Sequence, residues 1–96
     1  MKIDFTKNNE ILTVALDGRL DTTTAPELEK QLSQNWTDGS ALIFDCEKLS
    51  YISSAGLRVL LTAHKRIKGA MKLINVGELV MEVLEMTGFA DVWGIG

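Results

Sequence analysis

Apolar residues alternate with polar ones in two stretches at the start of the chain. They occupy every second position over residues 3–5 and again over residues 12–16, and Asn8-Asn9 between them is typical of a turn. Such alternation predicts strands with one buried face. The chain therefore opens with a predicted β-hairpin whose second strand ends near Asp17.

A helix is predicted after a polar loop at residues 18–23. Thr24 and Glu27 have the spacing of a capping box, and Pro26 is tolerated in a first helical turn. Residues at helical spacing give this helix one apolar side, formed by Ala25, Leu28, Leu32 and Trp36. The turn-forming residues 37–40 are expected to end it.

The middle of the chain predicts a buried strand, a loop and a second helix. Residues 41–44 are an apolar run that ends at Asp45, and apolar residues return at helical spacing over 56–61. Ser53 and Ser54 precede this helix, where a serine suits the N-cap or the first turn. The loop is expected to span residues 45–54, and the helix to stop at Gly69.

The last third predicts one more strand, over residues 71–76, and a short apolar helix that includes Leu79, between Gly77 and Gly88. The complete order predicts a small α/β domain that spans residues 1–96. It has a sheet of four to five strands, with an N-terminal hairpin and later strands parallel, packed with three to four helices. Loops that leave parallel strands open on one edge of a sheet. Residues 18–24, 45–54 and 75–78 are thus expected to converge, which places Asp21 and Asp45 near Ser54.

Composition narrows the classes of function. With 96 residues, 46% of them hydrophobic, the chain is one domain, and its net charge of −3 argues against a nucleic-acid binder. The basic cluster Lys65, Arg66 and Lys68 falls in a predicted last helical turn, where it complements the helix dipole. The lone Cys46 is expected to be a small buried hydrophobe. With neither a leader nor an apolar run of about 20 residues, we expect a cytoplasmic protein without direct membrane contact, metal or cofactor.

Catalysis by the chain is not expected. His64 is the single histidine, and ten residues of one predicted helix, about 15 Å of axial rise, separate it from Ser54. No nucleophile elbow or phosphate-binding glycine loop is present. The serines at the helix start therefore leave two interpretations, namely a cap worth about 1 kcal/mol and a phosphorylation site.

Asp45, Leu49 and residues 51–58 form a pattern that extends to residues 18–28, 73–76 and 84–89. Together these segments resemble the signature of the STAS-domain family, the bacterial anti-sigma factor antagonists. This resemblance implies a STAS fold with Ser54 as the phosphorylated serine. The best-studied pattern of the family has an aspartate where this chain has Ser53, which is therefore the alternative acceptor.

The resemblance also implies a partner-switching function. The partner of this chain would be an anti-sigma factor that is also a serine kinase. This kinase would bind the unmodified chain and release the phosphorylated one, and a serine phosphatase would reverse the change. The implied partner-binding residues are Asp21, Thr22, Thr23, Asp45, Ser53, Ser54 and Arg58. Arg58 lies one helical turn after Ser54, within reach of that serine or of Asp45. The alternatives are an adaptor in another partner-switching pathway and a domain that senses a small ligand or nucleotide.

Overall fold

The computed structural model describes residues 1–36, 40–67, 70–92 and 94–95. The strands are β1 (Lys2–Asn8), β2 (Ile11–Leu20), β3 (Ala41–Ile52), β4 (Met71–Ile74) and β5 (Gly94–Ile95), and the helices are α1 (Ala25–Asn35), α2 (Ser54–Arg66), α3 (Glu78–Thr87) and α4 (Phe89–Val92). The strands form one sheet in chain order, with β1 antiparallel to β2 and each later pair parallel. The predicted α/β sheet with an N-terminal hairpin is confirmed.

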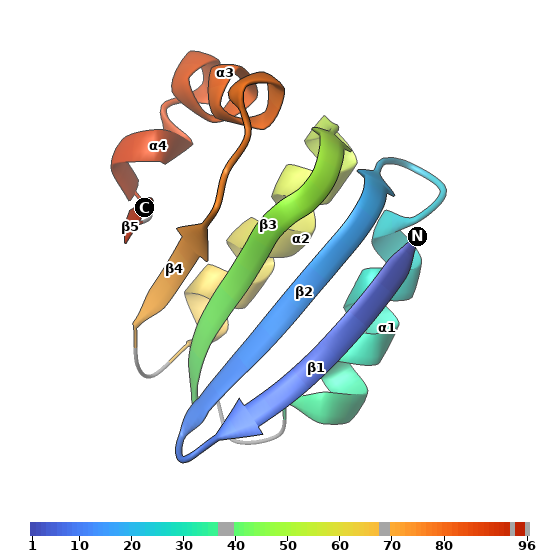
Figure 1. The fold of residues 1–96 in the computed structure, drawn as a ribbon, viewed down its shortest axis with the longest axis vertical. Coiled ribbons are helices and arrows are strands. Elements are labelled where there is room, and N and C mark those ends of the chain that lie inside the picture. The colour runs from blue at the N-terminus through green and yellow to red at the C-terminus, as the bar shows by residue number, and fades with distance from the viewer. Residues whose placement is uncertain (37–39, 68–69, 93, 96) are drawn as a thin grey trace.

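Helices α1 and α2 cover one face of the sheet, and α3 and α4 follow the carboxyl end of β4 (Figure 1). The alternating residues of the hairpin point into this helix-covered core, which explains why their pattern was visible in the sequence. The apolar side of α1 is confirmed as well, because all four of its predicted residues are buried. The largest fully buried side chains include Leu16, Leu20, Leu28, Phe44, Ile52, Leu60, Leu73 and Leu84.

Strand β3 is much longer than predicted and runs to Ile52 through most of the expected loop. It carries one more residue than β2 between Asp45 and Lys48, and another between Leu49 and Tyr51. Such bulges interrupt the alternation of buried and exposed side chains, so polar residues within the strand looked like a loop. Strand β2 also continues past its predicted end to Leu20, which leaves residues 21–24 as the connection to α1.

The helix boundaries confirm some predictions and correct others. Helix α3 begins after Gly77 and ends at Gly88, which has a left-handed φ of 82°. Strand β4 ends two residues early, because Asn75 takes a left-handed φ of 56°. Leu79 lies outside the core, with 66% of its side chain exposed. Lys65 and Arg66 do lie in the last turn of α2, whereas Lys68 and Gly69 are outside the described residues.

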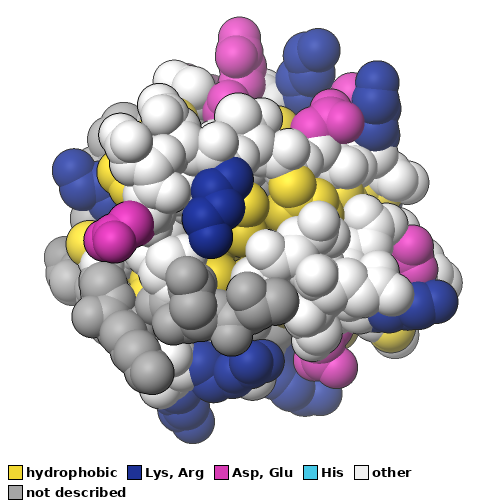
Figure 2. Space-filling model, turned by 90° about the horizontal axis from the view of Figure 1, so that it is seen from below, with side chains coloured by type: hydrophobic (Ala, Val, Ile, Leu, Met, Phe, Trp, Pro, Cys, Tyr) yellow, Lys and Arg dark blue, Asp and Glu magenta, His cyan; other side chains and the backbone are white. Residues whose placement is uncertain are grey.

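Cys46 is only 1% exposed, and its burial, together with the charge of Asp45, raises the pKa of the thiol to about 12. The thiol is therefore neutral and packs as a small hydrophobe, as predicted. In the view onto the amino ends of the parallel strands, Lys and Arg side chains are interspersed with Asp and Glu side chains (Figure 2). Within the described ranges, each helix is too short or too polar to span a bilayer.

Candidate functional site

The site lies where β2 and β3 end side by side. The backbone N–H of Ser53 donates a hydrogen bond to the carbonyl oxygen of Leu20 over 2.9 Å, and Leu20 is paired with Ile52 in the register of the sheet. This bond joins the connection 21–24, which enters α1, to the first residues of α2. Of the three loops predicted to converge, 18–24 and 45–54 meet here, whereas Asn75 of the third, 75–78, contacts Asp45 instead.

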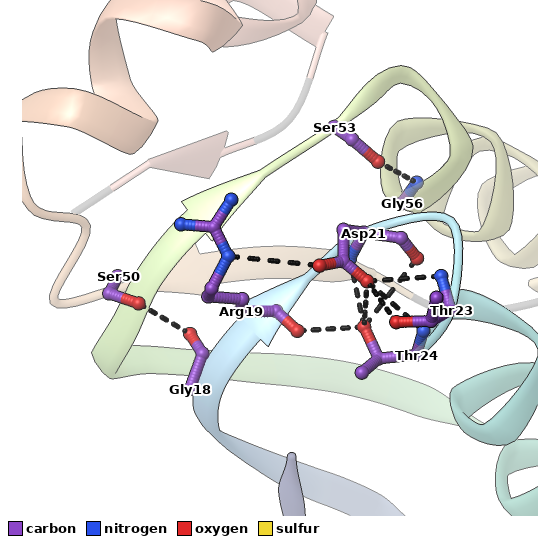
Figure 3. Close-up of polar contacts among 8 residues, drawn as sticks. All are labelled: Gly18, Arg19, Asp21, Thr23, Thr24, Ser50, Ser53 and Gly56. Atoms are coloured by element: carbon purple, nitrogen blue, oxygen red, sulfur yellow. Dashed lines mark hydrogen bonds and ion pairs between the residues drawn. The ribbon is translucent and has the colours of Figure 1, made fainter.

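Asp21 organises the entry to α1. Its Oδ1 accepts hydrogen bonds from the backbone N–H groups of Thr23 and Thr24, over 3.0 and 3.2 Å, and from the Thr23 hydroxyl over 2.7 Å (Figure 3). The Thr24 hydroxyl accepts from the Asp21 N–H and donates to the carbonyl of Arg19. The capping box predicted for Thr24 and Glu27 is wrong, because Thr24 makes no side-chain cap and Glu27 instead accepts a bond from Gln31.

The hydrogen bond from the Thr23 hydroxyl, with further backbone N–H bonds, lowers the pKa of Asp21 below its ordinary value of 3.8, against an opposing effect of burial. A carboxylate whose pKa is lower in the folded than in the unfolded state stabilises the fold at pH values above its unfolded-state pKa. This contribution is lost as the pH falls through the folded-state pKa. The network thus keeps Asp21 ionised in the native protein and holds residues 21–24 in place.

We expect Asp21→Ala to lower the Tm near neutral pH, and the difference from wild type to shrink in acid, because the lost contribution requires the carboxylate form. Thermal unfolding followed by circular dichroism, once near neutral pH and once in acid, measures the Tm difference between the variant and wild type. Thr22→Ala is the matched control, since Thr22 is exposed and its side chain makes no hydrogen bond to the described residues. A Tm difference of the same size at both pH values would show that the ionised network does not contribute.

The two serines occupy different positions at the start of α2. Ser53 is the N-cap, and its Oγ accepts a hydrogen bond from the Gly56 N–H over 3.4 Å (Figure 3). Ser54 is the first helical residue, is exposed, and has no hydroxyl hydrogen bond to any part of the chain that the structure describes. Capping and availability for modification are therefore divided between the two side chains.

A shallow groove of about 260 Å³ begins at Ser54 and separates α2 from the junction of α3 and α4. It is lined by Ser54, Leu57, Arg58, Leu61, Thr87 and Phe89. Arg58 is exposed and makes no ion pair with the described residues. The groove thus combines an apolar floor with an exposed hydroxyl and a cation on one wall.

Asp45 does not join this group, and its predicted position is wrong. Its Oδ1 accepts hydrogen bonds from the Glu47 N–H and from Asn75 Nδ2, both over 3.1 Å. It is paired with Ile74 at the end of β4 and lies seven residues before Ile52, about 20 Å along an extended strand. The predicted position was wrong because the bulges hid the true length of β3 in the sequence pattern. Strand β3 continues well beyond the end of the shorter β4, so Asp45 lies in the middle of the strand and not at its end.

Sequence reasoning missed the contact between Arg19 and Tyr51, which lie opposite each other on β2 and β3. The Arg19 guanidinium carbon lies 4.3 Å from the centroid of the Tyr51 ring, and Nε lies 3.7 Å from Asp21 Oδ2. This cation–π contact and ion pair link the end of the sheet to the α1 entry. Only the register that includes both bulges brings the two residues together, so no local pattern could have indicated them.

Among the described residues, no histidine lies within hydrogen-bond reach of Ser54. His64 lies on the same helix, about 15 Å of rise away. Across residues 1–36, 40–67 and the described part beyond, no group of three His, Cys, Asp or Glu side chains has a geometry that holds a metal ion. What the site presents instead is an exposed hydroxyl beside a structured loop and an apolar groove.

The chain resembles known proteins along nearly its whole length. The family model for the STAS domain matches residues 2–95. BtrV of Bordetella bronchiseptica, a proposed anti-sigma factor antagonist, is 32% identical and aligns over 99% of this chain and 85% of its own. The anti-sigma-B factor antagonist of Bacillus subtilis is 28% identical, with 96% and 87% covered.

Solved structures support the same fold. The anti-sigma factor antagonist SpoIIAA in its unphosphorylated form superposes with a TM-score of 0.83 at 19% identity, over 99% of this chain and 88% of that one. Its phosphorylated form, from Bacillus, gives a TM-score of 0.75 at 19% identity, over 99% and 91%. The family model, the relatives and the sheet with its helices agree, and the chain belongs to the STAS-domain family.

Proposed function

We propose that this chain is an anti-sigma factor antagonist that acts by binding and is switched by phosphorylation of Ser54. The unmodified chain binds an anti-sigma factor that is also a serine kinase, the phosphorylated chain is released, and a serine phosphatase resets it. Relatives of 32% and 28% identity are named for antagonism of anti-sigma factors, and SpoIIAA has a phosphorylated form. ATP and Mg²⁺ belong to the kinase, and the proposal places both proteins in the cytoplasm.

The observation that carries this proposal is the position of Ser54. Its hydroxyl is exposed and unengaged among the described residues, whereas the Ser53 oxygen is occupied as the helix cap. A helix start offers free N–H groups and the positive end of the helix dipole, so a phosphate of about −2 charge can be held there without unfolding the helix. Ser54 is therefore the better acceptor of the two.

The proposed contact surface combines the α1 entry with the start of α2. Thr22 and Thr23 are exposed on the connection that Asp21 holds in place, and Ser54 and Arg58 are exposed on α2. The bond between Leu20 and Ser53 keeps these two parts in a constant relative position. Such a preorganised surface loses little conformational entropy on binding. Asp45 lies outside this surface.

Mapping of the phosphorylated residue tests the proposal. After incubation with ATP and the serine kinase encoded nearest this gene, intact mass should rise by one phosphate, and fragment spectra should place it on Ser54. Ser54→Ala should abolish incorporation, while Ser53→Ala should only slow it and, as loss of a cap, cost about 1 kcal/mol of unfolding free energy. Ser54→Ala should leave stability nearly unchanged, because the structure shows no bond from its hydroxyl.

Two outcomes would contradict the proposal in different ways. A phosphate located on Ser53 would reverse the assignment of the acceptor while keeping the switch. Absence of phosphate from both serines, combined with a rise in Tm on adding a nucleotide, would instead favour a ligand-sensing domain.

A further inference from the structure

Helix α3 exposes two large apolar side chains that the fold does not use. Leu79 is 66% exposed and Met86 is 86% exposed, whereas Val80 and Leu84 on the same helix are buried in the core. Leu79 and Met86 are seven residues apart, or about two turns and 10 Å, and so share one side of the helix. Scattered apolar residues on a surface need no explanation, but an aligned pair forms a stripe.

One flank of this stripe is acidic. Glu78, Glu82 and Glu85 are exposed at spacings of four and three residues, which places them in one row. Glu82, Glu85 and Met86 line a shared shallow depression, so the row adjoins the stripe. Residues 78–87 contain no Lys or Arg, and none of the three glutamates has an ion pair within the described ranges. We call Leu79, Met86 and these glutamates the α3 patch.

The α3 patch is continuous with the groove beside Ser54. Thr87 follows Met86 and lines that groove together with Ser54 and Phe89, and its hydroxyl donates a hydrogen bond to the Val83 carbonyl of α3 over 2.8 Å. A standard interface covers about 800 Å² on each partner, a disc about 30 Å across, and α3 is about 15 Å long. A partner seated at Ser54 therefore extends onto α3.

Resting on the proposed function, we propose that the partner bound at Ser54 also covers the α3 patch, with a segment that has an apolar face edged by Lys or Arg. Charge complementarity favours this occupant, because the flank offers three carboxylates to cations. A second copy of the chain docked by α3 against α3 would bring six glutamates together, and an anionic membrane would be repelled. The α3 patch thereby selects partners by charge, while Ser54 controls release.

Affinity measurements on unmodified protein test this inference, with the purified kinase encoded nearest this gene as the probe. The double variant Leu79→Gln/Met86→Gln should bind at least fivefold more weakly in titration calorimetry, since the apolar contact is lost. Ile11→Gln is the matched control, because Ile11 is 40% exposed on β2 and lies away from the groove. All these side chains are exposed, so the variants should keep the wild-type Tm within a few degrees.

A charge reversal tests the acidic flank separately. Glu82→Lys/Glu85→Lys should weaken binding at low ionic strength and approach wild type at high salt, because exposed charges are screened. Glu10→Lys/Glu29→Lys, on the hairpin turn and α1, makes the same change in net charge at exposed positions and should bind like wild type.

The possible results separate this inference from the proposed function. Wild-type affinity in both α3 variants would overturn the inference, even if phosphorylation of Ser54 releases the partner. Weak binding by the α3 variants without any effect of Ser54 phosphorylation would keep the α3 patch and overturn the switch. A dimer of the chain that Leu79→Gln/Met86→Gln dissociates, or sedimentation of the chain with phosphatidylserine vesicles, would overturn the choice of occupant.

Discussion

Replacing Gly56 by alanine is expected to lower the free energy of unfolding by about 2 kcal/mol, although alanine usually favours a helix. A β-carbon at this position would lie 2.7 Å from Leu20 Cγ, 3.0 Å from Leu20 Cδ2 and 3.0 Å from Ile52 Cγ1. Leu20 and Ile52 are at most 1% exposed, so any shift of either side chain has to be taken up by the packed core around it. Overpacking of this kind costs up to about 3 kcal/mol, and the gain in helix propensity returns about 1.

Chemical denaturation of Gly56→Ala measures this loss, and the Tm should fall by roughly 10 °C in a domain of this size. Gly77→Ala is the control, because a β-carbon there meets nothing within 4 Å. Gly77 is the N-cap of α3, where alanine is less favourable than glycine, so the unfolding free energy of this variant should fall by no more than about 1 kcal/mol. If Gly56→Ala unfolds at the same denaturant concentration as wild type, the prediction is wrong, because α2 then has room for a β-carbon beside Leu20 and Ile52. The close approach of α2 to the strand ends positions Ser53 and Ser54, so the variant should also bind the partner more weakly.

Phosphorylation of Ser54 is expected to weaken binding of the proposed partner, an anti-sigma factor kinase, at least about tenfold, or some 1.4 kcal/mol. The phosphate adds about −2 charge and considerable bulk at the centre of the proposed surface, near the ionised Asp21. Misplaced charge at an interface costs several kcal/mol, whereas the helix dipole returns about 0.3 to 1. Repulsion and steric exclusion should therefore act without refolding, since Arg58 and the free helix N–H groups can hold the phosphate locally.

Titration of both forms against the kinase, together with amide NMR spectra of the free chain, tests this mechanism. Shifts should cluster at residues 20–24, 53–58 and 87–89. Ser54→Asp, with half the charge, should reproduce part of the effect, and Ser54→Asn, similar in size but neutral, should show much less. Equal affinities of the two forms would refute the switch. Shifts spread across β1 and β4 would show that release works through refolding.

Much of the architecture follows from the sequence alone. Alternation in the hairpin, the helical spacing in α1 and α2, and the glycines around α3 are local signals. Each of these elements forms in the predicted part of the chain, although β2 continues past its predicted end to Leu20. The order of strands and helices then requires parallel pairing, which brings the ends of β2 and β3 together. The position of Ser53 and Ser54 at a helix start could also be predicted, because it depends on local residue types and spacing.

The construction of the site depends on contacts between residues that are distant in the sequence. The bulges in β3 depend on its pairing with β2, a contact between distant residues, so the sequence pattern could not show that Asp45 lies far from Ser54. The α1 entry is another case, because Asp21 rather than Glu27 satisfies its backbone N–H groups once the strand end fixes that carboxylate. Local periodicity determines which elements form, whereas register and close packing between elements determine which side chains meet.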